Sequence, residues 1–133
     1  MGDEERKLRV LLVDDEPDML YLLQSVVSAE SWEIVGRATN APDAVRLAEK
    51  IEPDVAIVDY RMPGENGLEL AGRLRSLWPE ITNVVFSAMD VEREVLASGN
   101  VDRFVRKGDL KNLRTVLDQL NEAFQRRGGQ SGQ

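Results

Sequence analysis

Asp54-Val55-Ala56-Ile57-Val58-Asp59-Tyr60-Arg61-Met62-Pro63 contains four consecutive apolar residues that end on a carboxylate. The run 55–58 has no polar alternation, which is typical of a strand covered by helices on both faces of a parallel sheet. Asp59 would then lie at the carboxyl end of that strand. Because ligands of open α/β sheets bind at those ends, Asp59 is the first candidate for a reactive group.

The rest of the chain alternates short apolar strands with amphipathic helices. Further strands are predicted at 8–13, 32–38, 84–86 and 103–106. Helices are predicted from Pro17 to about residue 29, after the N-caps Asn40, Asn66 and Asp90, and from Asp109 to beyond Phe124. Five strands alternating with five helices predict parallel pairing with right-handed connections, so the expected fold is α/β with a doubly wound five-stranded parallel sheet.

The chain has 133 residues, which is the size of one ordinary domain. We expect this domain at 8–127, after an N-terminal extension at 1–7 and before a flexible tail or linker at 128–133. No apolar run approaches the roughly 20 residues that cross a bilayer, so no membrane association is expected. The absence of Cys gives no sign of an oxidising compartment, and the expected location is the cytoplasm.

Charge and composition exclude several functions. The formal net charge is −7, which argues against direct binding to nucleic acid, because such binding relies on basic side chains at the phosphates. The chain has no His, which removes the commonest general base, the commonest metal ligand and the phosphohistidine carrier. Any phosphorylation must therefore fall on another side chain.

Polar residues follow four of the predicted strands: Asp14-Asp15, Asp59, Ser87 and Lys107. In a parallel sheet these strand ends meet at one edge. Each residue alone has an ordinary interpretation, as a turn or helix cap for the acids, polar filler for Ser87 and a solvated charge for Lys107. Crowded carboxylates, however, repel one another unless a cation binds, and Mg²⁺ suits carboxylate ligands. The pattern predicts a Mg²⁺ site.

With Mg²⁺ bound, Asp59 could act as a nucleophile, because a carboxylate can carry covalent phosphate. Lys107 and the metal would neutralise the transferring oxygens, and the Ser87 hydroxyl could donate a hydrogen bond to one of them.

The chain resembles the receiver domain of two-component response regulators over about residues 8–124. The matching pieces are Val10-Leu11-Leu12-Val13-Asp14-Asp15-Glu16-Pro17, Val58-Asp59-Tyr60-Arg61-Met62-Pro63 with Gly67, Phe86-Ser87-Ala88 and Phe104-Val105-Arg106-Lys107. Their order and spacing carry the resemblance, because no single piece is decisive. It implies a flavodoxin-like (βα)5 fold with strand order 2-1-3-4-5.

The resemblance also implies a function and a set of roles. Asp59 would accept phosphate from a sensor histidine kinase, with Asp14, Asp15, Asp59 and the backbone carbonyl of Arg61 around Mg²⁺. Lys107 would contact the phosphate, and Ser87 and Phe104 would be switch residues that change the face built from the fourth helix, the fifth strand and the fifth helix. That face would bind an output partner or a second copy in a phosphorylation-dependent homodimer. The chain would be a phosphoacceptor that assists its own phosphorylation and dephosphorylation, and not an enzyme with a separate substrate.

One residue departs from the family pattern. Many receivers carry a Pro after the lysine, joined by a cis peptide bond, whereas Gly108 follows Lys107 here. A cis bond is therefore not expected. Lys-Gly is similar to receivers that precede LuxR-type helix-turn-helix domains, although the output domain or partner stays open.

Three alternative functions fit the sequence less well. A flavin- or nucleotide-binding domain would carry a Gly- or Ser/Thr-rich loop after the first strand, where Asp14-Asp15-Glu16 would repel phosphate. A haloacid-dehalogenase-like phosphatase would carry an Asp-x-Asp pair there, which adjacent aspartates do not provide. A receiver-like interaction module without phosphorylation would not need the acids, the hydroxyl and the lysine together.

Overall fold

The structure is a computed structural model that describes residues 7–28 and 32–131, with the backbone alone described at 28 and 128–131. Its strands are β1 (Leu8–Val13), β2 (Trp32–Ala38), β3 (Val55–Val58), β4 (Thr82–Ser87) and β5 (Arg103–Arg106). Its helices are α1 (Pro17–Ser28), α2 (Ala41–Ile51), α3 (Gly67–Leu77), α4 (Glu92–Ala97) and α5 (Leu110–Ser131). The alternation of strands and helices is as predicted.

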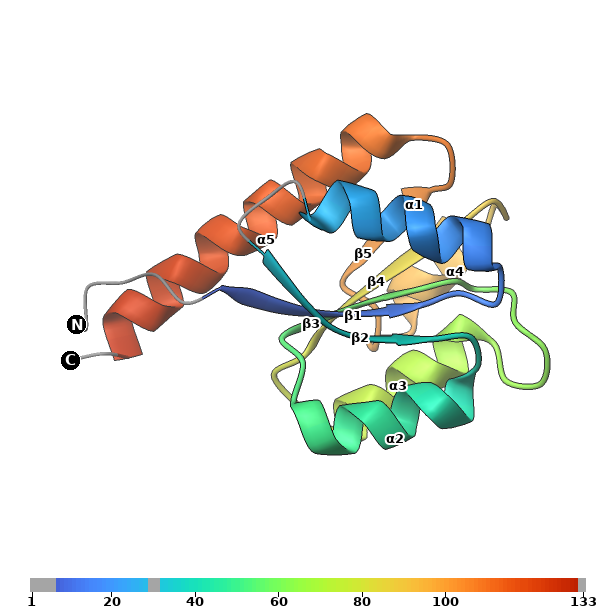
Figure 1. Cartoon of the computed structure of the whole chain (residues 1–133), viewed down its shortest axis with the longest axis horizontal. Coiled ribbons are helices and arrows are strands. Elements are labelled where there is room, and N and C mark those ends of the chain that lie inside the picture. The colour runs from blue at the N-terminus through green and yellow to red at the C-terminus, as the bar shows by residue number, and fades with distance from the viewer. Residues whose placement is uncertain (1–6, 29–31, 132–133) are drawn as a thin grey trace.

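All five strands pair in parallel in the order β2-β1-β3-β4-β5, which confirms the predicted fold class (Figure 1). The central strand β3 is buried at every residue, as expected for an apolar run with helices on both sides. Helices α1 and α5 cover one face of the sheet, and α2 and α3 cover the other (Figure 1).

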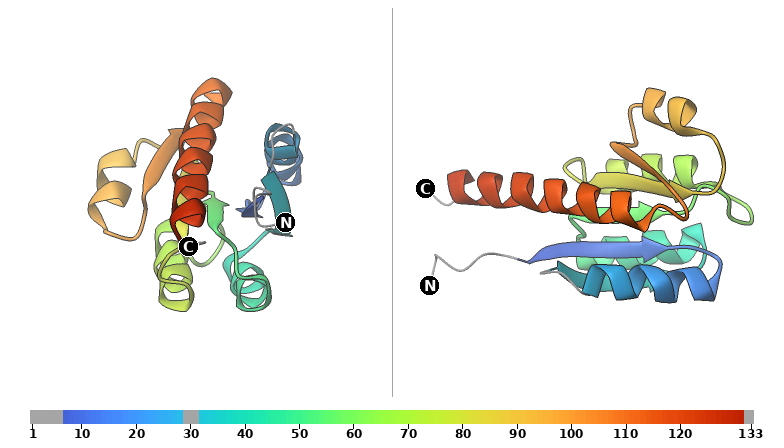
Figure 2. Two further views of the ribbon diagram at one scale, coloured as in Figure 1. Left: turned by 90° about the vertical axis from the view of Figure 1, so that its left-hand side faces the viewer. Right: turned by 90° about the horizontal axis from the view of Figure 1, so that it is seen from above.

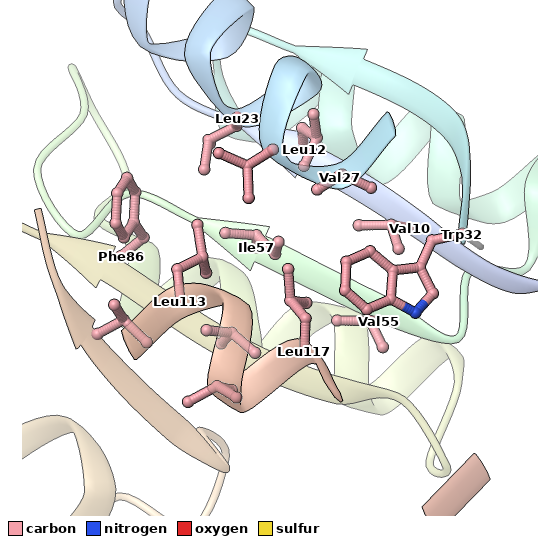
Figure 3. Close-up of a cluster of buried hydrophobic side chains, with 14 of the residues drawn as sticks. Val10, Leu12, Leu23, Val27, Trp32, Val55, Ile57, Phe86, Leu113 and Leu117 are labelled. Carbon is pink, nitrogen blue, oxygen red and sulfur yellow. The ribbon is translucent and has the colours of Figure 1, made fainter. Parts of the chain in front are cut away.

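Two apolar clusters hold the three layers together. The first lies between the sheet and α1 and α5, where Leu23 of α1 and Leu113 and Leu117 of α5 surround Ile57 of β3 (Figure 3). The second lies on the opposite face, under α2, α3 and α4, and includes Val95 of α4. Burying one such side chain contributes roughly 1.5–3 kcal/mol, so the alternation of β-strand side chains between the two faces fixes the register of the whole sheet.

Short polar residues begin several helices as predicted. The Asn40 side chain accepts a hydrogen bond from the Asp43 amide, and Asn66 forms a capping box with Glu69. The Asp109 carboxylate accepts from the Asn112 amide at the start of α5. These caps fix where the loops at the functional edge of the sheet end.

The predicted cap at Asp90 is wrong. Helix α4 begins at Glu92, and among the described residues no side chain caps its N-terminus, where Val91 occupies the cap position. The Asp90 carboxylate instead lies 3.2 Å from the Arg106 guanidinium of β5.

The C-terminal segment also differs from the prediction. Helix α5 continues to Ser131, so the backbone of 128–131 is helical where a flexible tail was expected from Gly128. Once a helix has formed, each further residue adds a backbone hydrogen bond, which lets α5 extend. The predicted N-terminal extension at 1–7 lies, except for Lys7, outside the described residues.

In the described part of the chain no helix is long and apolar enough to cross a membrane.

Candidate functional site

The predicted site residues meet at the carboxyl edge of the sheet. Backbone hydrogen bonds extend the strand pairing by one residue and hold the strand ends in place: the Asp59 amide donates to Val13 at 2.9 Å, and the Lys107 amide donates to Ser87 at 2.9 Å. The Asp14 amide donates to the carbonyl of Ala38 at 3.1 Å. The side chains that follow β1, β3, β4 and β5 are therefore positioned by the sheet, not by mobile loops.

Three carboxylates form a compact cluster. One oxygen each of Asp14, Asp15 and Asp59 lies within 4.8 Å of the other two. Asp14 and Asp59 are buried, with exposed fractions of 0% and 5%, and Asp15 is more open. Hard carboxylate oxygens around a partly open space are the ligands that Mg²⁺ prefers, so this donor set fits the predicted metal.

Lys107 is the cation of this cluster. Its ammonium lies 2.9 Å from Asp14 Oδ2, 3.2 Å from Asp59 Oδ2 and 3.6 Å from Glu16 Oε1. The side chain is only 11% exposed, so the ordinary interpretation of a solvated surface lysine is excluded. Burial lowers the pKa of Lys107, but Asp14 and Asp59 raise it more strongly, and the pKa lies above its ordinary value of 10.5. Lys107 is charged at neutral pH.

The two buried aspartates have raised pKa values. Burial raises the pKa of Asp14, and the Glu16 amide and Lys107 offset only part of the rise. Burial and then the charge of Asp14 raise the pKa of Asp59, against the attraction of Lys107. The unfolded chain exposes these carboxylates to water, with an ordinary value of 3.8. The charged forms therefore cost stability, and the folded protein loses stability as the pH rises from 3.8 through the raised pKa values.

We expect Asp14→Asn to stabilise the metal-free protein at neutral pH by on the order of 1 kcal/mol, or roughly 4 °C in Tm. Asparagine keeps the oxygen that accepts a hydrogen bond from the Glu16 amide and removes the buried charge. The gain should shrink as the pH falls towards 3.8, where the aspartate becomes protonated in both states. Thermal unfolding of both proteins in EDTA, from neutral pH down to 3.8, measures this difference in Tm.

Asp118→Asn is the matched control, because it removes one charge at an exposed position of α5. It should leave Tm nearly unchanged. A lower Tm for Asp14→Asn in EDTA, or a gain that does not depend on pH, would contradict the stability cost assigned to the buried Asp14 charge.

Ser87 lies at the wall of a cavity beside Asp59. Its side chain is buried, and its Oγ accepts a hydrogen bond from the Met89 amide at 3.0 Å, which leaves the hydroxyl hydrogen free to point elsewhere. The cavity has a volume of about 500 Å³ and is open to solvent. Its lining includes Asp15, Glu16, Asp59, Arg61, Met62, Ser87, Met89 and Lys107.

Arg61 and Phe104 are near the cluster in different ways. Arg61 lines the cavity, and its amide lies 3.4 Å from Asp59 Oδ1. Phe104 pairs with Val85 in the sheet and is half-buried against the second apolar cluster, so it is less enclosed than a core residue.

The Lys107-Gly108 turn requires a left-handed backbone, with φ of +97° at Gly108, and none of the described peptide bonds is cis.

The structure shows two contacts beside Asp59, made by Gly67 and Tyr60, that the sequence does not reveal. The Gly67 amide donates to the Tyr60 carbonyl at 2.7 Å, and a Cβ atom at Gly67 would lie 2.2 Å from the Asp59 carbonyl oxygen. The Tyr60 hydroxyl lies 3.4 Å from Glu94 of α4. Burial and the charge of Glu94 raise the pKa of Tyr60, so the phenol is a hydrogen-bond donor at neutral pH.

Curated relatives share this sequence pattern. Residues 10–118 match the family model described as response regulator receiver domain. The nitrate/nitrite response regulator protein NarL of Escherichia coli is 36% identical over 90 residues, which are 67% of this chain and 42% of that protein. The chemotaxis protein CheY of Thermotoga maritima is 32% identical over 66% of this chain and 73% of that protein. The chain thus spans less than half the length of NarL.

Solved structures share the fold. The signal receiver domain of the response regulator NarL from Mycobacterium tuberculosis matches with a TM-score of 0.79 and 27% identity, over 88% of this chain and 98% of that one. The receiver domain of AraT from Geobacillus stearothermophilus matches with a TM-score of 0.81 and 25% identity, over 92% and 98%. The family model covers most of the chain, and the chain belongs to the family of response regulator receiver domains.

Proposed function

We propose that this chain is a phosphorylation-controlled switch of a two-component system, in which Asp59 accepts a phosphoryl group from a sensor histidine kinase with Mg²⁺ as cofactor. The observation that carries the proposal is the joint position of three carboxylates and one buried lysine at the mouth of an open cavity. A structural ion pair needs one acid for one lysine. Three acids around one ammonium leave negative charge that a metal ion would balance.

The proposed reaction forms one bond and breaks one. A carboxylate oxygen of Asp59 bonds to phosphorus while the P–N bond of the kinase phosphohistidine breaks, and the imidazole nitrogen keeps the electron pair. The Lys107 ammonium, 3.2 Å from Asp59 Oδ2, would neutralise a phosphoryl oxygen. The Ser87 hydroxyl would donate a hydrogen bond to another phosphoryl oxygen. These residues orient the group, and the kinase supplies it.

Asp14, Asp15, Asp59 and the backbone carbonyl of Arg61 would hold the Mg²⁺. When bound, the ion would supply positive charge to the transferring oxygens and relieve the repulsion between the carboxylates. The same residues would support hydrolysis of the aspartyl phosphate by water, so the chain would assist its own dephosphorylation without acting on a separate substrate.

Ser87 and Phe104 would transmit the effect of phosphorylation from the site to the surface of the protein. Ser87 pairs with Arg106, and Phe104 lies two residues before it on β5, so a movement at the end of β4 reaches the edge strand directly. We expect the face built from α4, β5 and α5 to change and to bind an output partner or a second copy of the chain. Both arrangements of this face exist before phosphorylation, and phosphate shifts their populations. We place this switch in the cytoplasm and without direct contact to nucleic acid.

We expect Ser87→Ala to accept a phosphoryl group but not to transmit it. With acetyl phosphate and Mg²⁺, both the unaltered protein and Ser87→Ala should gain one phosphoryl group by intact mass, and neither should in EDTA. Hydrogen exchange at residues 90–110 should change on phosphorylation in the unaltered protein, and less than half as much in Ser87→Ala, because the hydroxyl that follows the phosphoryl group is missing.

Ser25→Ala is the control, because Ser25 is an exposed residue of α1 whose hydroxyl donates within the helix. It should respond as the unaltered protein does. An equal response at 90–110 in Ser87→Ala would rule out Ser87 as the switch, and mass gain in EDTA would rule out the metal.

A further inference from the structure

Helix α4 is attached firmly at its C-terminal end. Asn83, fully buried in β4, donates from Nδ2 to the Asn100 carbonyl at 2.9 Å and to the Ala71 carbonyl of α3 at 3.1 Å. Asp102 Oδ2 accepts from the Asn83 amide at 2.8 Å and from the Arg75 guanidinium of α3 at 2.5 Å. These bonds tie the segment that follows α4 to both β4 and α3.

The N-terminal end of α4 has much weaker attachments. The helix has six residues and stands at the outer edge of the molecule (Figure 2). All six residues are described, and of these only Val95 is buried. Within the described chain no side chain caps its start. The Asp90–Arg106 ion pair before it is open to solvent, with side-chain exposures of 89% and 51%, and such pairs contribute little.

Val91 packs partly against the second apolar cluster, and a polar attachment comes from the residue next to the phosphoacceptor. The Tyr60 hydroxyl donates to Glu94 Oε2 at 3.4 Å, while the ring of Tyr60 packs against the second apolar cluster. The Tyr60 carbonyl is in turn held by the Gly67 amide. Tyr60 therefore connects the end of β3 to the N-terminal half of α4 by a route that does not pass through Ser87 or Phe104.

We propose that Tyr60 is a positioning residue that latches the N-terminal half of α4, so that α4 moves about its fixed C-terminal end when the latch opens. The inference rests on the proposed function and adds a control element to it. A phosphoryl group that draws Ser87 inward would lengthen the bond from the Met89 amide to Ser87 Oγ, which holds the loop before α4. The loop and the start of α4 would then leave Tyr60.

The latch opposes that movement. A bond that is present in one arrangement and broken in the other shifts the balance between them by its own strength. Removing the Tyr60 hydroxyl should therefore make α4 open more often, and it should make the phosphorylated arrangement easier to reach.

The test compares Tyr60→Phe with Tyr21→Phe, which removes a phenol hydroxyl from an exposed tyrosine of α1. Without any phosphodonor, amide exchange in 92–97 should be about threefold faster in Tyr60→Phe, as expected for the loss of one exposed hydrogen bond. Exchange in 100–105, where the C-terminal attachment lies, should be unchanged. With Mg²⁺ and beryllium fluoride as the phosphate mimic, Tyr60→Phe should bind the mimic about threefold more tightly. Tyr21→Phe should match the unaltered protein in both measurements.

The outcomes separate this inference from the proposed function. If the unaltered protein binds no beryllium fluoride, the phosphoacceptor function fails, whatever α4 does. A second outcome is that the unaltered protein binds the mimic, but Tyr60→Phe has the same amide exchange in 92–97 and the same affinity for the mimic as Tyr21→Phe. That outcome overturns the latch and leaves the proposed function standing. Equal acceleration in 92–97 and 100–105 would show a general loss of stability and would also overturn the latch.

Discussion

Gly67→Ala is expected to destabilise the protein by about 3 kcal/mol, because it forces a methyl group into a space already filled by backbone. The added Cβ would lie 2.2 Å from the Asp59 carbonyl oxygen and 2.9 Å from the Asp59 carbonyl carbon. Neither atom can rotate away as a side chain would. Removing this steric clash would require α3 or the end of β3 to move, and both are fixed by buried side chains such as Leu70 and Val58.

The control lies in the same helix. A Cβ at Gly72 would meet only the Asn100 side chain, at 3.3 Å, so Gly72→Ala should be neutral or stabilise the protein by up to about 1 kcal/mol through its better helix propensity. Urea unfolding of both variants measures the difference. Gly67→Ala with the stability of Gly72→Ala would show that the close approach of α3 to Asp59 does not exist.

The architecture and the residues of the acidic edge follow from sequence because both depend on local patterns. Uninterrupted apolar runs mark buried parallel strands, and the polar residues that end them must meet once the strands pair. The structure brings Asp14, Asp15, Asp59, Ser87 and Lys107 together for this reason. Asn40 and Asn66 cap helices because their side chains reach amides only three residues away.

Other features depend on contacts between distant residues, and sequence patterns do not record these. The sequence places Gly67 at the start of a helix but does not reveal that it packs against the Asp59 carbonyl. Asp90 has the chemistry of a cap but pairs with Arg106, sixteen positions later. The burial of Lys107 and the contact between Tyr60 and Glu94 also require knowing which elements are neighbours.

The second large effect that we expect is the loss of phosphorylation in Asp59→Asn, because this change would remove the proposed nucleophilic oxygen while keeping the size of the side chain. Asp59 lines the cavity and has the Lys107 ammonium 3.2 Å from one oxygen. Asp14 lies 2.9 Å from the same ammonium but is fully buried. Asp15 lines the cavity but, within the described residues, forms no ion pair with Lys107. The charge and the cavity therefore favour one acceptor among the three acids.

The most direct measurement locates the phosphoryl group. The protein is treated with acetyl phosphate and Mg²⁺, reduced with borohydride so that an aspartyl phosphate becomes homoserine, digested and sequenced by tandem mass spectrometry. We expect homoserine at position 59 in the unaltered protein, and neither homoserine nor mass gain in Asp59→Asn. Homoserine at position 14 or 15 in the unaltered protein, or an undiminished mass gain in Asp59→Asn, would contradict the assignment of Asp59 as the phosphoacceptor.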